Sequence, residues 1–165
     1  MKTRLITSLA VAALATMSLS SCALISPQAT LDPYAPSDGV EVNVADLEVR
    51  NLMFITDPDA QEFNLVFGVV NSGPDSAKLG FRVVDADGKE IGSADVKVEA
   101  GFSTFGDLSA EPVTMKLRGV EPGTVVTVYV QTPGGEQRTS IPVLDGTLKD
   151  ADGTYAFPEY RELVP

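Results

Sequence analysis

The chain has 165 residues, with 12 Lys and Arg against 23 Asp and Glu, one Cys, and no His or Trp. Without His it has no imidazole general base, no Ser–His or Cys–His nucleophile, and no histidine ligand for a metal. The net charge of −11 opposes a phosphate backbone, so nucleic acid is not an expected partner. The length suits a single domain.

The first 21 residues have the layout of a secretory signal peptide. Lys2 and Arg4 precede an apolar run from Leu5 to Met17. That run is too short to span a bilayer comfortably as a permanent helix. We therefore expect residues 1–21 to be removed during export.

The last three residues of this segment and the Cys that follows resemble a bacterial lipobox, Leu19-Ser20-Ser21-Cys22, in which the Cys receives diacylglycerol and becomes the first residue. Cys22 is the only cysteine, and a thioether would consume a thiol that is otherwise reactive in an exported protein. Two or more acyl chains, palmitate among them, anchor a protein permanently. The prediction is a lipoprotein of the cell membrane, held on the extracytoplasmic face. The alternative is an ordinary signal peptide that ends near a buried Cys.

Three regions are expected after the signal peptide. Residues 22–38 carry three prolines and no periodic pattern, which is typical of a lipid-anchored linker. Residues 39–145 are expected to form the folded domain. Residues 146–165 are polar with three aromatic side chains, so they form either a disordered tail or a flap that packs back on the domain. The aromatic residues are Tyr155, Phe157 and Tyr160.

Apolar and polar residues alternate through the folded domain, with no helical stripe. The pattern predicts strands over 40–44, 47–55, 62–70, 77–85, 94–100, 113–118, 124–132 and 139–144, and a hairpin return at 90–91. This spacing favours an all-β fold, an antiparallel β-sandwich of about seven or eight strands, Ig-like or cupredoxin-like.

Three details of these strands are predicted as well. A bulge is expected near Arg50 and Asn51, because the apolar face changes there. Residues 62–70 are apolar on both faces, which is typical of a central strand. Pro142 cannot donate a ladder hydrogen bond, so 139–144 is predicted to be an edge strand.

Aspartates and methionines are the candidate metal ligands. Once the signal peptide is removed, Met53 and Met115 are the remaining thioethers, and thioethers suit copper(I). Met115 lies on the apolar phase of its strand, so a place in the core is expected. The close aspartate pairs could supply oxygens to calcium, but they lack the further ligands of a full loop, and turn chemistry explains them. These pairs are Asp57 and Asp59, Asp85 and Asp87, and Asp150 and Asp152.

Two resemblances to known families follow from short motifs. The stretches 34–39 and 49–52, Tyr-Ala-Pro-Ser-Asp-Gly and Val-Arg-Asn-Leu, resemble the actinobacterial LpqE lipoproteins, a family without an established activity. More distantly, the order of features is similar to the PCu(A)C periplasmic copper chaperones. Those features are Val49-Arg50, Leu65 to Asn71, Met115 to Gly119, Pro122-Gly123 to Val130, and Ile141-Pro142-Val143.

The second resemblance implies a cupredoxin-like sandwich that holds copper with His and Met. Because this chain has no His, the resemblance supports the fold and not the metal site. The expected function is a non-catalytic, lipid-anchored binding or accessory lipoprotein without a cofactor. Its partner would be an envelope protein, a glycan or a small molecule. The candidate surfaces are the turns at 71–75 and 134–135, or the aromatic C-terminal stretch. The alternative function is a carrier of copper or calcium.

Overall fold

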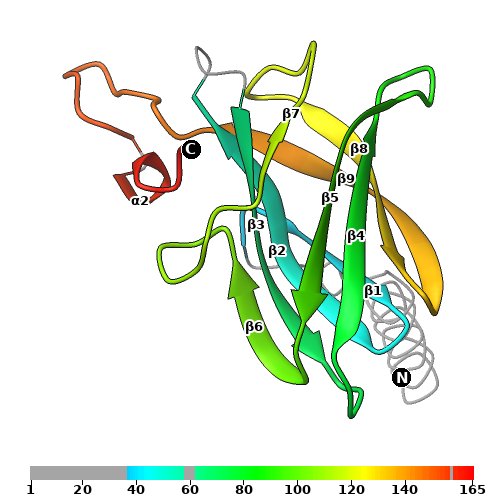
Figure 1. The fold of residues 1–165 in the computed structure, drawn as a ribbon. Helices are drawn as coiled ribbons and strands as arrows, with labels where there is room; N and C mark the ends of the chain where they lie inside the picture. Colours follow the sequence, from blue (N-terminus) through cyan, green and yellow to red (C-terminus); the bar gives the residue numbers. More distant parts are fainter. Residues whose placement is uncertain (1–36, 58–61, 157) are drawn as a thin grey trace, which may run out of the picture. The chain divides into compact units, whose positions relative to one another are not determined.

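The computed structural model describes residues 37–57, 62–156 and 158–165, and strands dominate these residues. The predicted signal peptide, the lipobox-like residues Leu19, Ser20, Ser21 and Cys22, and the linker as far as residue 36 lie outside the described residues. Figure 1 shows the strands β1 (Val40–Val44), β2 (Leu47–Thr56), β3 (Glu62–Asn71), β4 (Ala77–Val84), β5 (Glu90–Val98), β6 (Gly101–Phe105), β7 (Thr114–Lys116), β8 (Val125–Thr132) and β9 (Gly135–Asp145), and the short helix α2 (Pro158–Arg161).

The strands form one curled mixed sheet of nine strands, which confirms the predicted all-β fold. The path is β5-β4-β8-β9-β2-β3-β6, with β1 paired to β2 and β7 paired to β3. The prediction of a purely antiparallel sheet was wrong, because the end of β9 runs parallel to β2. This parallel pair joins Phe54 to Val143 and Thr56 to Asp145.

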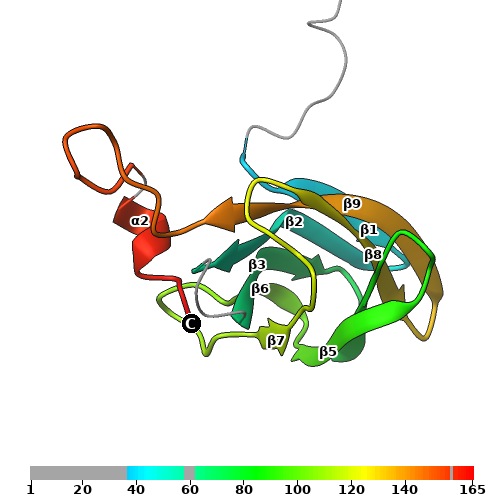
Figure 2. The same ribbon diagram turned by 90° about the horizontal axis from the view of Figure 1, so that it is seen from above.

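The sheet curls over itself so that its two halves face one another. By strand pairing, β1, β2, β3, β6 and β7 form one half, and β4, β5, β8 and most of β9 form the other. Figure 2 shows the curled sheet from above. Fully buried side chains from both halves meet between them, for example Leu65 and Phe67 with Phe81 and Val128. The rings of Phe67 and Phe81 lie 4.8 Å apart between centroids. The arrangement is therefore sandwich-like, with the main core between the halves.

The predicted bulge in β2 is confirmed. The β2–β3 register shifts between Arg50 and Met53, and Asn51 has a φ of 54°, in the left-handed region that Asn tolerates better than most residues. The Asn51 side chain accepts a hydrogen bond from the backbone N–H of Gly39 at 3.0 Å. The bulge thereby fixes the start of β1 beside β2.

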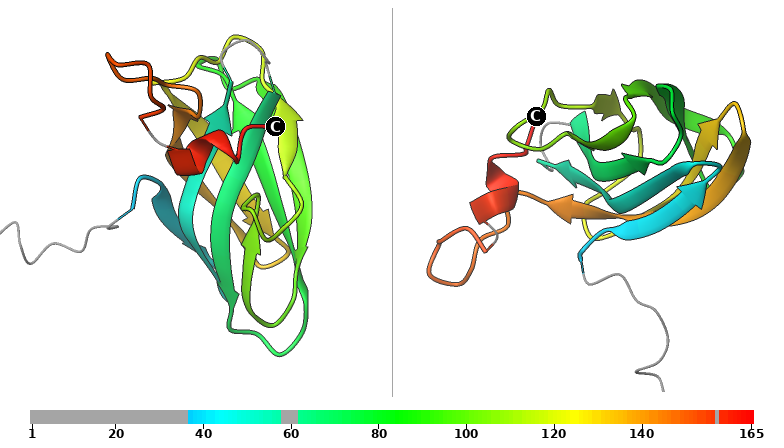
Figure 3. Two further views of the ribbon diagram at one scale, coloured as in Figure 1. Left: turned by 90° about the vertical axis from the view of Figure 1, so that its left-hand side faces the viewer. Right: turned by 90° about the horizontal axis from the view of Figure 1, so that it is seen from below.

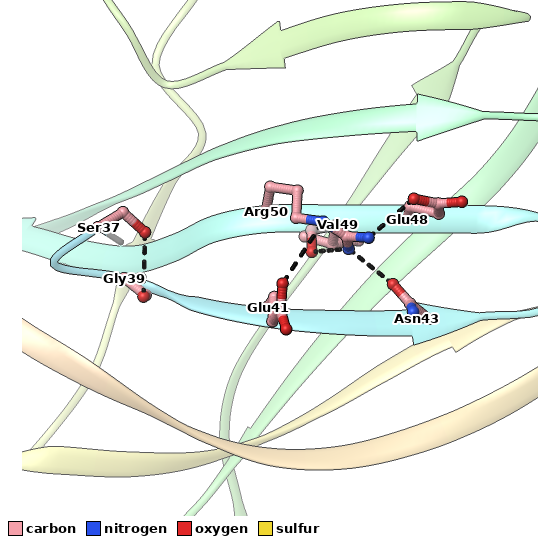
Figure 4. Close-up of polar contacts among 7 residues, drawn as sticks. All are labelled: Ser37, Gly39, Glu41, Asn43, Glu48, Val49 and Arg50. Atoms are coloured by element: carbon pink, nitrogen blue, oxygen red, sulfur yellow. Dashed lines mark hydrogen bonds and ion pairs between the residues drawn. The ribbon is translucent and has the colours of Figure 1, made fainter. Parts of the chain in front are cut away.

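Arg50 binds three polar side chains on the outer surface of β1 and β2, as Figure 4 shows. Its guanidinium donates to Asn43 at 2.6 Å and to Glu48 at 2.8 Å, and it lies 3.6 Å from Glu41. The contacts are partly exposed, so each adds little to stability. The contacts to Glu41 and Asn43 cross from β2 to β1 and support the register of the two strands.

Strand β9 is an interior strand, so the prediction of an edge strand from Pro142 was wrong. The N–H of Val143 donates to Thr124 O and its C=O accepts from Gly123 N–H, so both groups face the β8 side. Because successive residues of a strand face opposite neighbours, the nitrogen of Pro142 points toward β2. The pairing with β2 begins only at Val143, so no ladder hydrogen bond is lost.

Two other elements differ from the predicted ones. The return at 90–91 and the strand at 94–100 are one strand, β5, because β4 pairs with it along its whole length. Strand β6 was not predicted, since its sequence Gly-Phe-Ser-Thr-Phe has no clear alternation. It forms against the open edge of β3, where Phe105 stacks on Phe67 at 4.9 Å.

The described part of the C-terminal segment, residues 146–156 and 158–165, covers part of the outer surface of β2 and β3. Figure 3 shows α2 lying against these strands. There the buried Met53, Ile55 and Val66 form a second, smaller core. The partly buried residues that pack on it are Leu144, Tyr160, Leu163 and Val164. In the part of the chain that the structure describes, no helix has the length and hydropathy to cross a membrane.

Candidate binding pocket

An apolar pocket of about 360 Å³ lies between the end of β9 and the C-terminal segment. The volume falls at the lower end of the range for small-molecule sites in proteins, roughly 300–1,000 Å³. Apolar groups dominate its walls, and three residues place polar groups there. The lining residues are Asp38, Pro122, Gly123, Val143, Leu144, Asp145, Leu148 and Tyr160.

The first wall is formed where β9 passes from β8 to β2. Val143 is fully buried, and its two backbone hydrogen bonds to residues 123 and 124, of 2.8 and 2.9 Å, hold the Pro122-Gly123 turn against β9. The backbone here is held on both sides, because residues 143–145 of β9 also pair with β2. This wall is therefore rigid.

The C-terminal segment forms the second wall through Leu148 and Tyr160. The chain turns sharply after β9, where Asp145 Oδ1 accepts from the N–H and the hydroxyl of Thr147 at 2.7 and 2.8 Å. The N–H of Gly146 donates to Thr56 O at 3.0 Å, which continues the β2 pairing by one residue. The turn leaves Leu148 with 48% of its surface exposed at the pocket.

Buried Asn64 fastens the far end of the same segment. Its Nδ2 donates to Leu163 O at 2.9 Å and to Gly106 O at 2.7 Å, and its Oδ1 accepts from the N–H of Val113 at 3.1 Å. The side chain is 1% exposed, so these partners replace water completely. Asn64 thus ties three separate segments to β3.

A hydrogen bond from the Tyr160 hydroxyl to Asp38 Oδ2 joins residues that are 122 positions apart. Both residues line the pocket. Burial of the phenol, together with its hydrogen bond to the Asp38 carboxylate, raises the pKa of Tyr160 well above its ordinary value of 10.0. The phenol is therefore neutral at physiological pH and acts as the donor in this contact.

The polar groups of the pocket favour a particular class of ligand. Asp38 and Asp145 supply acceptor oxygens, and none of the described lining residues is a lysine or arginine. Anions would meet two carboxylates and no cation. The walls therefore suit a molecule with an apolar body and a cationic or hydrogen-bond-donating group.

The structure does not bring the predicted metal ligands together. Met53 is 2% exposed and lies in the smaller core, whereas Met115 is 6% exposed and lies in the main core. Among the described residues, no group of three or more Cys, Asp or Glu is arranged to hold a metal ion.

The aspartate pairs that are described form turns. Asp85 Oδ1 accepts from the N–H groups of Asp87 and Lys89 at 3.0 and 2.9 Å. Asp152 accepts from Thr154 N–H at 3.0 Å, and this bond lowers the pKa of Asp152. Asp59 lies outside the described residues. The contacts match the turn chemistry expected from Asp-x-Asp-Gly.

Both predicted candidate surfaces can be located. The turn at 71–75 is organised by Asn71, which donates to Asp75 O at 2.9 Å and accepts from Gly73 N–H at 3.0 Å. The aromatic C-terminal stretch contributes Tyr160 to the pocket, while Phe157 lies outside the described residues. Sequence reasoning missed Leu148 and the 122–123 turn. An isolated leucine in an otherwise polar segment was the available signal for Leu148.

No family model and no curated protein matches the chain. Among solved structures it is similar to a β-glucuronidase of Parabacteroides merdae, described with glycerol in its active site, at 14% sequence identity. The match covers 58% of this chain and 13% of that one, with a TM-score of 0.35. The chain thus spans a small fraction of that enzyme's length, and a likeness this low carries no argument about family or activity.

Proposed function

We propose that the protein is a non-catalytic, lipid-anchored binding protein of the cell envelope, and that its ligand occupies the pocket beside the C-terminal segment. The single observation that carries this proposal is the pocket itself, with its rigid apolar wall and its two carboxylates. The ligand class is a small molecule with an apolar body and an amine or another donor group.

The anchor makes the first prediction. Replacing Cys22 with Ala removes the sulfur that would carry diacylglycerol, so the protein should move from the membrane fraction to the soluble fraction. The measurement is fractionation of cells that express the full-length chain, followed by immunoblotting. Ser21→Ala is the matched control, because it keeps a small residue before the Cys and should leave the protein in the membrane. Membrane retention of the Cys22→Ala protein would refute the lipidation proposal.

The second prediction concerns how binding depends on the charge of the ligand. Octylamine should bind more tightly than octanol, and octanoic acid should bind least, because all three share one chain and differ only in the group that meets Asp38 and Asp145. Binding is measured by calorimetry below the concentration at which each compound aggregates. Asp145→Asn keeps the oxygen that accepts from Thr147 and removes the charge. It should reduce the preference for octylamine over octanol by about tenfold at most.

Two further variants locate the binding site. Leu148→Ser should weaken all three compounds by about fivefold, since roughly 1 kcal/mol of apolar contact is lost. Val125→Ser is the matched control, because Val125 is also an exposed apolar residue, at 70%, but does not line this pocket. Equal effects of the two substitutions, or no binding of any of the three compounds, would contradict the proposed site.

A further inference from the structure

Strands β5 and β6 are the two ends of the sheet path, and each has an edge without a strand partner in the described structure. These edges border one groove of about 620 Å³. Residues 93–97 of β5 form one side, and residues 104–105 and 110–114 form the other. Five consecutive residues of β5 are thus open to the groove. An open strand edge offers a row of backbone N–H and C=O groups to another strand.

The main core reaches the surface along this groove. Four of the residues that line it are only partly buried and pack against the core: Ala94, Val96, Phe105 and Val113. On the opposite face of β5, Asp95 and Lys97 are exposed. A strand that pairs with β5 would therefore meet apolar side chains on its inner face and charged ones on its outer face.

If β5 of a second copy runs antiparallel to β5 and the pairing is centred on Val96, the two strands are complementary. In that register Val96 lies opposite Val96 of the partner subunit, and Ala94 lies opposite Val98. Asp95 then lies opposite the partner subunit's Lys97, and Lys97 opposite the partner's Asp95. Apolar residues meet on one face and opposite charges meet on the other, which is the pairing that stabilises antiparallel strands.

The charges within one chain leave this pairing available. Asp95 contacts Lys78 at 2.8 Å and Lys97 contacts Glu99 at 2.7 Å, all with side chains that are at least 60% exposed. Lys78 also lies directly opposite Lys97 in the β4–β5 register, which places two like charges together. An additional carboxylate beside Lys97 would offset this repulsion.

We propose that the β5 edge pairs with β5 of a second copy of this chain, forming a two-fold symmetric dimer with a continuous sheet. The occupant is a second copy, because an antiparallel copy of β5 places its Lys97 opposite Asp95 and its Asp95 opposite Lys97. An isologous contact of this kind closes on itself and stops at two copies. The dimer is independent of the small-molecule pocket, whose residues lie on other strands.

The test uses cross-linking of the full-length, membrane-anchored protein. Val96→Cys should form a disulfide-linked dimer on oxidation, since directly opposite residues have Cβ atoms about 4.5–5.5 Å apart. Ser140→Cys, an exposed position on β9, is the matched control and should give no dimer. The parent chain controls for cross-linking through Cys22.

Charge substitutions in the Val96→Cys background then test the register. Asp95→Lys and Lys97→Asp each create two like-charge pairs, so each alone should reduce the cross-linked fraction about tenfold. The two single variants co-expressed with different tags should cross-link to each other, because their charges are complementary. The double variant Asp95→Lys with Lys97→Asp should recover self-pairing. Thermal melting of each variant confirms that it is folded. If Asp95→Lys does not fold, the test of the register uses Lys97→Asp alone.

This pattern of loss, cross-pairing and recovery would support the dimer. No dimer at Val96→Cys, or a dimer that is insensitive to the charges, would overturn it. If the β5 amides are protected from hydrogen exchange only when a different protein is present, the occupant is a foreign strand and the proposal is wrong.

Discussion

Replacing Asn64 with Leu is expected to lower the free energy of unfolding by about 3 kcal/mol or more. Leucine has a similar size but cannot donate to Gly106 O and Leu163 O, or accept from Val113 N–H. Three backbone groups, one buried and two partly buried, would lose their partner at once. The measurement is equilibrium denaturation with urea.

The control for this prediction is Asn43→Leu, since Asn43 is exposed on β1 and, among the described residues, its side chain is hydrogen-bonded only to the partly exposed Arg50. It should cost less than about 1 kcal/mol. A small effect of Asn64→Leu, comparable to that of the control, would show that water or a shifted backbone replaces the lost hydrogen bonds. Hydrogen exchange at Val113 and Leu163 distinguishes local from global loosening.

Replacing Gly146 with Ala is expected to detach the C-terminal segment from β2. A Cβ at this position would overlap Val164 Cγ2, lie 2.8 Å from Tyr160 O and lie 3.1 Å from Ile55 Cγ2. Tyr160 O belongs to α2 and Val164 follows it in the chain, so relieving these contacts displaces the C-terminal segment. We expect a loss of about 1–3 kcal/mol in stability. Octylamine binding should fall by tenfold or more, because the second wall of the pocket moves.

The control is Gly135→Ala, at a glycine whose added Cβ would meet only Val44 Cγ2 at 3.8 Å, an ordinary contact. It should leave both melting and binding unchanged. Melting and octylamine binding together distinguish detachment of the C-terminal segment from loosening of the whole fold. Detachment should expose Met53, Ile55 and Val66 to solvent. Unchanged binding in a Gly146→Ala protein would mean that the segment is not part of the site.

The strands that could be predicted are those whose pattern of apolar residues reflects their burial. Apolar and polar residues alternate where one face is buried, and the run is apolar throughout where both faces are buried. β3 reads as apolar on both faces because the main core covers one face and Tyr160, Leu163 and Val164 cover the other. The bulge at Asn51 was predictable because it reverses the apolar phase within one strand. β6 was not, since its place depends on the open edge of β3 and not on its own pattern.

The role of Pro142 could not be inferred from local chemistry. A missing N–H excludes a strand from the interior of a sheet only where a neighbouring strand needs that donor. Here the pairing of β9 with β2 begins one residue after Pro142. The pocket escaped sequence reasoning for a related reason. Its residues come from the start of the domain, the 122–123 turn, β9 and the C-terminal segment, and only the tertiary fold brings these together.

The position of β9 has a consequence for the order in which the chain folds. β9 is the last strand, yet it alone joins the β8 half of the sheet to the β2 half, so neither half can close over the core until β9 has been made. The contact between Tyr160 and Asp38 is later still. Pairings this distant in sequence slow folding, because the chain must lose the entropy of loop closure before the stabilising contacts can form. For a chain that is exported as proposed, this topology delays closure of the core until nearly the whole polypeptide has been synthesised.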